Sequence, residues 1–411
     1  MTDSMKLHLE SIGPINEADI NISNITVVGG YNSTGKSTLS KVLYSFLRAN
    51  SFNRQEIAYK SISKLIFREY RHVSRHLSPE DADKIKRPSF RVLRDCEYYD
   101  VLFDFYENMK LLIQELELER QYSKRFKTID ELIRIYEENS TELYISLMRT
   151  LMESEFSSNN FNCYIDINGN IVDFKHYDFN DNEAFSLSDG SIIVDDVFYI
   201  DSLSILDTFD RHRFLDMKSP NHLEHLKKNL VDKDKDVFDD KINENIIELE
   251  KEITDIIHGK FVFELGELKF ISEKNFRSDM QNTASGTKQI GLIQLLLANR
   301  KLSNSFLIID EPEVNLHPEW QFKLAKILVL ISKKLNISIY INTHSPLFIE
   351  SVHTYADYYD ILDKTTYHLT KLEDNKVNIK EVEENNLSEI YDNLGKPYFD
   401  MDILRLEKEL D

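Results

Sequence analysis

Hydrophobic positions near the start of the chain alternate with polar ones, which is the period of a strand rather than a helix. The alternation runs through residues 5–22, with a turn signal at Gly13-Pro14. The β-branched run Ile25-Thr26-Val27-Val28 then predicts a buried strand. We therefore expect a small sheet that leads into residue 30.

The middle of the chain changes to helical spacing. No glycine occurs between Gln55 and Glu155, which predicts an almost entirely helical block. The period of two returns over residues 161–200, where Asn168-Gly169 is a hairpin signal. Residues 203–258 are helical again, with apolar residues spaced alternately by four and three at Ile242, Ile246, Leu249, Ile253 and Ile256. Two heptads of this kind are too short for a long coiled-coil arm.

The last third of the chain mixes both periods. Apolar strand patterns on either side of Gly266 predict a hairpin. From about Thr366 the pattern predicts a strand, a turn at Asp374-Asn375, a second strand and an acidic helical tail. We expect Gly395-Lys396-Pro397 to break that tail. The expected fold class is α/β, with a mixed central sheet and helical insertions.

The stretch from Gly30 to Ser37 has the phosphate-loop order of glycine, four residues, glycine, lysine and serine. A predicted strand precedes it and helical spacing follows it, which is the context that such a loop requires. Gly30 and Gly35 let the backbone approach phosphate, with Asn32 and Thr38 as further nucleotide-binding residues of the loop. Lys36 would reach the β- and γ-phosphates of ATP. Ser37 would bind Mg²⁺. A plain glycine turn that opens a helix would leave the Gly-Lys-Ser order unexplained.

Two further strands end in chemically active residues. The apolar run 306–309 leads directly into Asp310 and Glu311, which places both carboxylates at the exit of a buried strand. Asp310 is suited to hold Mg²⁺, and Glu311 is suited to orient and deprotonate an attacking water. The strand 337–341 leads to His344, which is placed to sense the γ-phosphate.

A second anion-binding feature lies upstream of these strands. Ser285 and Gly286 come immediately before an apolar helix that begins near Ile290, and the N-terminus of a helix attracts phosphate. One chain already has one phosphate cradle. A second cradle is useful if it faces a nucleotide that another subunit holds.

Together these motifs resemble the ABC-type ATPases of the SMC, RecF and OLD-like group. The resemblance rests on the phosphate loop, Ser285-Gly286, Asp310-Glu311-Pro312-Glu313 with Leu316-His317-Pro318, and Thr343-His344-Ser345. In that group two heads sandwich two ATP molecules, which implies a homodimer or higher homo-oligomer. By resemblance, Lys36, Ser37, Asp310, Glu311 and His344 act within one subunit. Ser285 and Gly286 then act on the partner's nucleotide.

The same resemblance orders the chain into segments. These are the N-terminal part of the ATPase head (1–54), a helical insertion (55–158), head strands (159–202), a second helical insertion (203–258), the head with signature and catalytic strands (259–365), and a C-terminal hairpin with an acidic tail (366–411). The signature reads Ala-Ser-Gly-Thr-Lys-Gln, unlike that of membrane transporters. Only Tyr199-Ile200-Asp201-Ser202 offers a candidate for the glutamine loop of the group.

OLD-type nucleases carry a TOPRIM module after the ATPase core, and the residues that follow His344 are too few for one. The chain therefore looks like an ATPase whose effector, a nuclease or toxin, is a separate protein, as in bacterial anti-phage defence operons. A DNA-repair or chromosome-maintenance ATPase is the alternative. A transporter cassette fits poorly, because the segment between Lys36 and Thr283 is much longer than the helical lobe of a cassette. A small-molecule kinase fits poorly as well, because it would leave the signature motif unexplained.

The net charge of −21 argues against a surface that coats nucleic acid indiscriminately. Residues 54–94 are the exception, with eleven Lys/Arg against five Asp/Glu. Five of these cations are spaced to share one face of a helix: Lys60, Lys64, Arg68, Arg71 and Arg75. This basic stripe predicts either a contact with nucleic acid or an acidic partner, or a solvated face that the chain's own acids balance.

Cys96 and Cys163 lie far apart and have no metal-ligand spacing, which is typical of a reducing compartment. Residues 1–10 contain no apolar signal segment, and no run of about 18 apolar residues occurs. We expect a cytoplasmic protein without a membrane partner.

Overall fold

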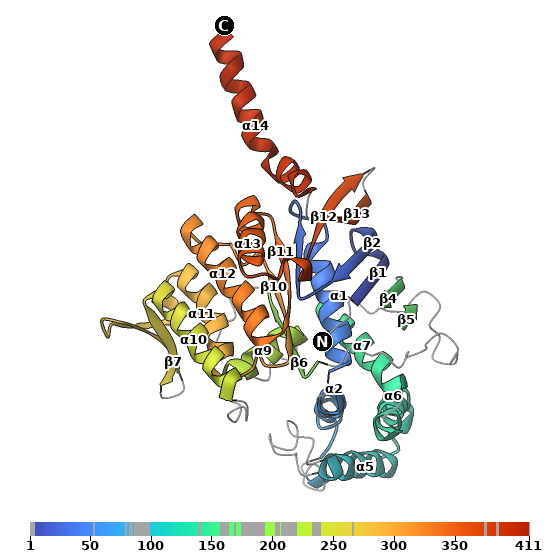
Figure 1. The fold of residues 1–411 in the computed structure, drawn as a ribbon. Coiled ribbons are helices and arrows are strands. Elements are labelled where there is room, and N and C mark those ends of the chain that lie inside the picture. Colours follow the sequence, from blue (N-terminus) through green and yellow to red (C-terminus); the bar gives the residue numbers. More distant parts are fainter. Residues whose placement is uncertain are drawn as a thin grey trace. The chain divides into compact units, whose positions relative to one another are not determined.

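The computed structural model describes most of the chain and divides it into two units (Figure 1). The described residues are 5–51, 54–78, 80–81, 85, 99–138, 141–156, 164–167, 170–173, 194–201, 206, 220–231, 240–264, 267–373, 376–383 and 386–410. Unit 1 contains Met1–Leu47 and Ser154–Asp411. Unit 2 is Arg48–Glu153, which overlaps the expected insertion 55–158.

Ten strands of the described chain form one mixed sheet in unit 1. In spatial order they are β5 (Asn170–Asp173), β4 (Tyr164–Ile167), β1 (Met5–Ile12), β2 (Ile15–Ile22), β13 (Lys376–Val382), β12 (Thr365–Glu373), β3 (Ile25–Gly29), β11 (Ser338–Thr343), β10 (Ser305–Asp310) and β6 (Asp196–Ile200). The five strands from β12 to β6 run parallel. The pairs β1–β2, β1–β4, β4–β5 and β12–β13 are antiparallel. The predicted α/β class with a mixed central sheet is confirmed.

Hydrophobic patterning explains which strands are central. Every residue of β3 and β10 is buried, as expected for parallel strands that are covered on both faces. β1 and β2 instead alternate between buried and more exposed residues. The predicted hairpin at Asn168-Gly169 is confirmed by the pairing of Ile167 with Asn170, although the two turn residues lie outside the described part of the chain.

Helices of unit 1 cover this sheet, and all of them except the first contribute side chains to one hydrophobic core that they share with it. They are α1 (Lys36–Ala49), whose last two residues belong to unit 2, α9 (Asn221–Val231), α10 (Asp240–Ile257), α11 (Ser285–Ala298), α12 (Pro318–Leu335), α13 (Pro346–Tyr358) and α14 (Ser388–Leu410). In Figure 1, α10, α11, α12 and α13 lie together on the left of the sheet. α9 and α10, expected as a second insertion, thus pack inside unit 1. Short 3-10 turns occur at Met280–Asn282 and Leu362–Lys364.

A small second sheet follows α10. β7 (Gly259–Glu264), β8 (Glu267–Ser272) and β9 (Arg277–Asp279) pair in that order in the described residues. The hairpin predicted around Gly266 is confirmed by the pairing of Glu264 with Glu267. β7 lies against α11, where Phe261 packs closely on Gly291.

The described part of unit 2 is almost entirely helical, as predicted. It contains α2 (Arg54–Val73), α5 (Tyr99–Glu115), α6 (Glu119–Glu138) and most of α7 (Thr141–Phe156) around their own core. The prediction was wrong for Arg75. The helix ends at Val73, where the amide of His76 bonds the Val73 carbonyl in a tighter turn, so only the first four residues of the basic stripe share a helix. Lys84, Arg94 and the cations between them lie outside the described residues, as do Cys96 and Cys163.

The expected break in the C-terminal tail was also wrong, since α14 continues through Gly395-Lys396-Pro397. A proline has no N–H, so Pro397 leaves the carbonyl of Asn393, four residues earlier, without its helical donor. The hydroxyl of Tyr31 donates to that carbonyl instead. The first half of the helix packs on the sheet through Ile390 and Leu394.

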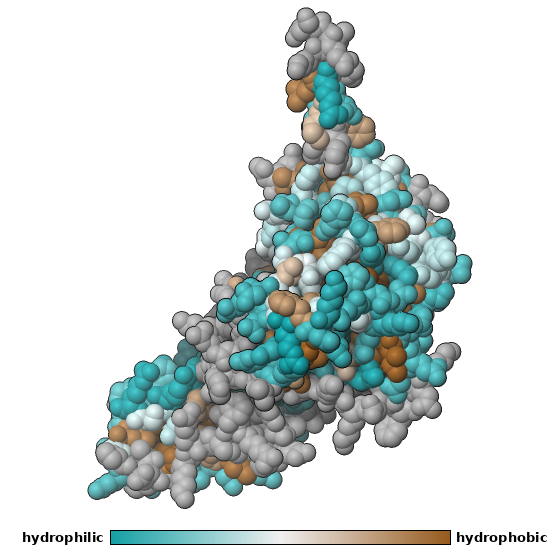
Figure 2. Space-filling view, turned by 90° about the vertical axis from the view of Figure 1, so that its left-hand side faces the viewer, coloured by the Kyte–Doolittle hydropathy of each residue, from teal (hydrophilic) through white to brown (hydrophobic). Residues whose placement is uncertain are grey.

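The second half of α14 extends away from the sheet (Figure 1). Figure 2 shows hydrophobic residues on this part of the helix, at the top of the view. Four large apolar side chains are exposed there: Phe399, Met401, Ile403 and Leu404. None of the helices in the described part of the chain combines the length and apolar character that crossing a lipid bilayer requires.

Two helical glycines predict opposite effects of the same substitution. A Cβ on Gly291 would lie 2.0 Å from the ring of Phe261, whereas a Cβ on Gly395 would meet nothing within 4 Å. Gly291→Ala should destabilise the protein by about 1–3 kcal/mol through overpacking. Gly395→Ala should stabilise it by about 0.5–1 kcal/mol through helix propensity. Urea unfolding of both variants measures this, and an equal effect of the two would contradict it.

Candidate nucleotide-binding site

The phosphate loop connects β3 to α1. At its two glycines, Gly30 and Gly35, a larger residue would clash with its neighbours. Gly35 has a φ of +83°, and a Cβ there would lie 2.7 Å from Ile15. A Cβ on Gly30 would lie 1.8 Å from the hydroxyl of Thr370 on β12. That hydroxyl donates to Thr34 at 2.7 Å, and Thr34 donates to the Tyr31 carbonyl at 2.7 Å. The loop is therefore shaped by a C-terminal strand.

Lys36 lies in the centre of the loop and is only 5% exposed. Its Nζ donates to the carbonyls of Gly30 at 2.9 Å and Tyr31 at 2.7 Å. Burial lowers the pKa of this amine, while the carboxylates of Glu311, Asp310 and Glu313 oppose that shift. These three groups thus lie near enough to act on the lysine electrostatically.

The remaining loop residues differ in exposure. Asn32 and Ser37 are exposed, and Thr38 is half-buried beside Gly13. Ser37 is in the first turn of α1, so its hydroxyl lies at the N-terminal end of the helix with the unpaired amide groups. Exposed oxygen and amide donors at such an end suit a phosphate and its hard metal ion.

Asp310, at the end of β10, is held by three donors from three different elements. Its Oδ1 accepts from Ser40 of α1 at 2.7 Å and from the Asn342 amide of β11 at 2.6 Å. Its Oδ2 accepts from the hydroxyl of Tyr199 on β6 at 2.8 Å. These hydrogen bonds fix the orientation of both carboxylate oxygens and satisfy a side chain that is nearly buried.

Ser40 and Asn342 were not among the predicted site residues. Ser40 lies one helical turn after Lys36, so helical spacing could have placed it on the same face. Asn342 immediately precedes the predicted Thr343-His344-Ser345 and stands opposite Asp310 in the sheet register. Tyr199 was named only as part of a glutamine-loop candidate. No local motif connects these residues with Asp310, because their contact depends on sheet order.

Glu311 follows β10 in an unusual backbone conformation, with a φ of +50°. Its amide donates to the carbonyl of Asn342 at 2.8 Å, which fixes the turn. A non-glycine residue in this region is strained, and such strain is concentrated at functional sites. The half-exposed Glu311 carboxylate comes within 3.5 Å of the His344 imidazole.

Glu313, which the sequence did not single out as a site residue, organises the loop that carries His344. Its Oε1 accepts from the Thr343 hydroxyl at 2.6 Å and from the His344 amide at 3.0 Å. The His344 ring nitrogen is 3.4 Å from the same oxygen. Burial raises the pKa of Glu313, against these hydrogen bonds, which favour its ionised form. His344 is thus positioned between two carboxylates.

The signature residues lie at the first turn of α11. Ser285 is exposed and Gly286 is buried. A Cβ on Gly286 would lie 3.0 Å from the Asn315 carbonyl and 3.1 Å from Leu316, in the loop that follows Glu311. The N-cap residue Ala284 offers no side-chain cap, so the first amide groups of α11 lack a side-chain acceptor there. Gly286 is therefore packed against the loop that follows Glu311 in the same chain.

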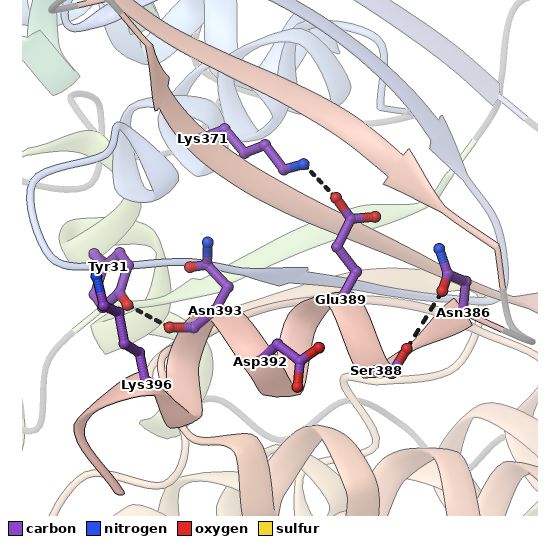
Figure 3. A pocket seen from close by; sticks show the side chains of 8 residues that line it. All are labelled: Tyr31, Lys371, Asn386, Ser388, Glu389, Asp392, Asn393 and Lys396. Atoms are coloured by element: carbon purple, nitrogen blue, oxygen red, sulfur yellow. Dashed lines mark hydrogen bonds and ion pairs between the residues drawn. The ribbon is translucent and has the colours of Figure 1, made fainter. Parts of the chain in front are cut away.

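A shallow cavity of about 610 Å³ lies beside the phosphate loop (Figure 3). Tyr31 forms one side, and residues of α14 form the other. Lys371 of β12 pairs with Glu389 across it. The link from Tyr31 to the Asn393 carbonyl closes one end, as the dashed line in Figure 3 shows.

A buried ionic cluster lies behind Tyr199. The imidazole of His222 contacts Glu155 and is 3.0 Å from Asp201. Burial alone would lower the pKa of His222, but the contacts with Asp201 and Glu155 outweigh it and raise the pKa to about 9. The buried histidine is therefore positively charged at neutral pH.

The described residues fit MgATP at this site. Lys36 and the amide groups of the loop are suited to phosphate, while Ser37 and Asp310 offer the oxygen ligands that Mg²⁺ prefers. The predicted residues Lys36, Ser37, Asp310, Glu311 and His344 come from the carboxyl ends of β3, β10 and β11, which are neighbours in the sheet. Ser285 and Gly286 instead lie on α11.

A comparison with known protein families identifies the family of the chain. The sequence profile of the AAA ATPase domain matches residues 5–349. The chain belongs to this ATPase family, whose members bind nucleotide. No curated protein matches the sequence.

Three solved structures are similar in fold. One is the SMC head domain from Thermotoga maritima, with 12% identity, 93% of this chain and 100% of that chain covered, and a TM-score of 0.37. An Smc head bound to the C-winged helix domain of ScpA has 9% identity, coverage of 92% and 97%, and a TM-score of 0.41. MJ1267, an ATP-binding cassette of an ABC transporter in its ADP conformation, has 11% identity, coverage of 97% and 97%, and a TM-score of 0.36.

The charged state of His222 predicts a pH-dependent stability. Its pKa of about 9 in the folded protein exceeds the ordinary 6.5, so its contribution is complete below about pH 6.5 and is lost as pH rises through 9. The difference corresponds to on the order of 3 kcal/mol. Urea unfolding at pH 6 and pH 9.5 should show a His222→Gln penalty that shrinks by this amount at the higher pH. A penalty independent of pH would contradict the assignment.

Proposed function

We propose that the chain hydrolyses MgATP at the carboxyl ends of β3, β10 and β11 and uses the reaction as a dimerisation switch. The main support is the convergence of Lys36, Asp310, Glu311 and His344 at this edge of the sheet. A lysine, a metal-binding carboxylate, a second carboxylate and a histidine are the groups that phosphoryl transfer to water requires.

Each residue has a separate task in this reaction. Lys36 binds the β- and γ-phosphates, and the amide groups of the loop with Gly30, Asn32, Gly35 and Thr38 surround them. Ser37 and Asp310 hold Mg²⁺, which neutralises charge on the phosphates when bound. Glu311 accepts a proton from the attacking water, and its backbone turn keeps it at the strand exit. His344 contacts the γ-phosphate and is aligned by Glu313.

The role of Glu311 predicts a variant that binds ATP but hydrolyses it slowly. Glu311→Gln keeps the size and polarity of the side chain but removes the base, so the hydrolysis rate should fall by about 10²–10⁴-fold. Lys36→Ala should weaken ATP binding itself. Phosphate release and equilibrium binding of ATP measure the two effects. A Glu311→Gln protein with the wild-type rate would show that another group is the base.

Ser285 and Gly286 support the dimeric part of the proposal. Gly286 is fixed against the loop of its own subunit, whereas the first amide groups of α11 have no side-chain cap. We assign these groups to the γ-phosphate held by the partner subunit, so that ATP joins two heads. In such a dimer, each ATP would be bound by the phosphate loop of one subunit and by Ser285 and Gly286 of the other.

Mixing two inactive variants tests action across the interface. In a symmetric dimer of Ser285→Arg with Lys36→Ala subunits, one site carries both defects and the other carries neither. Hydrolysis should therefore recover partly, to at most about half the wild-type rate per heterodimer. Native mass measurement verifies that heterodimers form. Heterodimers without any recovery would exclude action in trans.

We further propose that the switch controls a separate effector, a nuclease or toxin, in cytoplasmic anti-phage defence. The support is the resemblance of the motifs to stand-alone ATPases of such systems.

The second candidate is DNA repair or chromosome maintenance, and the exposed cations Lys64, Arg68 and Arg71 favour it. Against it, Lys60 and Arg68 of the basic stripe pair within the chain, with Glu56 and with the buried Glu69. Duplex DNA that stimulates hydrolysis by the pure protein would favour the second function over the first.

A further inference from the structure

Three residues of the buried ionic cluster take no part in the reaction described above. Glu155 and His222 have side chains that are 0% and 1% exposed. Asp201 follows β6 and completes the cluster. Burying charged groups is costly unless they are paired and hydrogen-bonded, and here His222 is paired with both acids.

Glu155 belongs to the last turn of α7, where the chain has just entered unit 1 at Ser154. The hydroxyl of Ser154 accepts from the Asn221 amide at 2.9 Å, and Glu155 Oε1 accepts from the His222 amide at 3.0 Å. These two side chains satisfy amide groups at the N-terminus of α9 that have no partner inside the helix. The end of α7 therefore fixes the start of α9.

Lys41 fixes the same point from α1. Its Nζ donates to the Glu155 carbonyl at 3.0 Å and lies 5.6 Å from the ring centre of Phe156. Tyr44, one turn later on α1, donates to the Asn221 side chain at 3.0 Å. The helix that carries the phosphate loop is thus joined to α9 and to the end of α7.

His222 in turn holds Tyr199. The two rings lie 4.5 Å apart between centres, at 38° to one another, and Tyr44 lies 6.1 Å from Tyr199 on another side. With its ring fixed in this way, the Tyr199 hydroxyl is directed at Asp310 Oδ2. Because the His222 imidazole packs on the Tyr199 ring and the Tyr199 hydroxyl donates to Asp310, an effect of His222 on Asp310 can pass through the tyrosine.

We propose that Glu155 and His222 are positioning residues for the metal-binding carboxylate, and that they act by holding Tyr199 on Asp310. The inference rests on the proposed role of Asp310 in binding Mg²⁺. Ser40 and Asn342 hold Oδ1 only, so Tyr199 is what prevents the carboxylate from turning. A ligand that can turn loses affinity for its metal, because the productive geometry must then be selected at each binding event.

The same helix offers a matched control. His225, one turn further along α9, is 2.9 Å from Asp196 and stacks on Phe198 at 5.4 Å. It thus repeats the pattern of a histidine with an acid and an aromatic ring of β6, yet Phe198 has no hydroxyl to direct at Asp310. His225→Gln should remove a comparable ion pair and ring contact without changing the metal site.

The test measures metal binding directly. The probe is Mn²⁺ in the presence of ADP, followed by the loss of the free Mn²⁺ signal in electron paramagnetic resonance. Tyr199→Phe and His222→Gln should each raise the dissociation constant of Mn²⁺ about tenfold, the usual effect of losing an outer-shell partner. His225→Gln should leave it unchanged, and ADP affinity without metal should be the same in all variants. Glu155→Gln, which keeps an acceptor for the His222 amide, serves if His222→Gln does not fold.

The double variant decides the route. If His222 acts through Tyr199, adding His222→Gln to Tyr199→Phe should cost little more than Tyr199→Phe alone. Additive losses, or equal losses in His222→Gln and His225→Gln, would overturn the positioning role. Wild-type protein that binds neither ADP nor Mn²⁺ would overturn the proposed ATPase site itself, and the positioning role with it.

Discussion

The carboxylate of Asp310 is the group around which the nucleotide-binding edge of the sheet is built. A nearly buried carboxylate needs hydrogen-bond donors, since removing it from water without them would cost several kcal/mol or more. Its donors come from α1, β6 and β11, so one side chain joins the helix of the phosphate loop to the strands on both sides of β10. Tyr340 supports this arrangement by donating to the Asn342 side chain at 2.9 Å.

The phosphate loop depends equally on parts of the chain that lie far from it in sequence. Thr370 fills the space that a side chain at position 30 would need, and it bonds Thr34 within the loop. Tyr31 is tied to α14 at the one carbonyl that Pro397 cannot serve. The motif supplies the groups that bind phosphate, whereas contacts with the C-terminal hairpin and helix hold its backbone in place.

Local patterns predicted the phosphate loop, the two strand exits with Asp310 and His344, the hairpins and the helical block, because each depends on residues close in sequence. The sequence did not predict the three partners of Asp310, which are Ser40, Tyr199 and Asn342. Their contact with it requires the order and register of three parallel strands. The continuation of the helix through Pro397 was not predicted for a related reason. The hydroxyl that replaces the missing donor belongs to Tyr31, near the other end of the sequence. Glu313 could have been noticed, as it stands two residues after Glu311.

The position of β12 also governs when the site can form during synthesis. β3 is made early, but its two neighbours in the sheet, β11 and β12, are more than 300 residues away in the chain. At ordinary rates of translation, the synthesis of β11 and β12 follows that of β3 by on the order of tens of seconds. Unit 2 has its own core of nearer contacts and can fold on the ribosome meanwhile. The nascent chain therefore contains its complete phosphate motif long before the strands that shape the loop have been made.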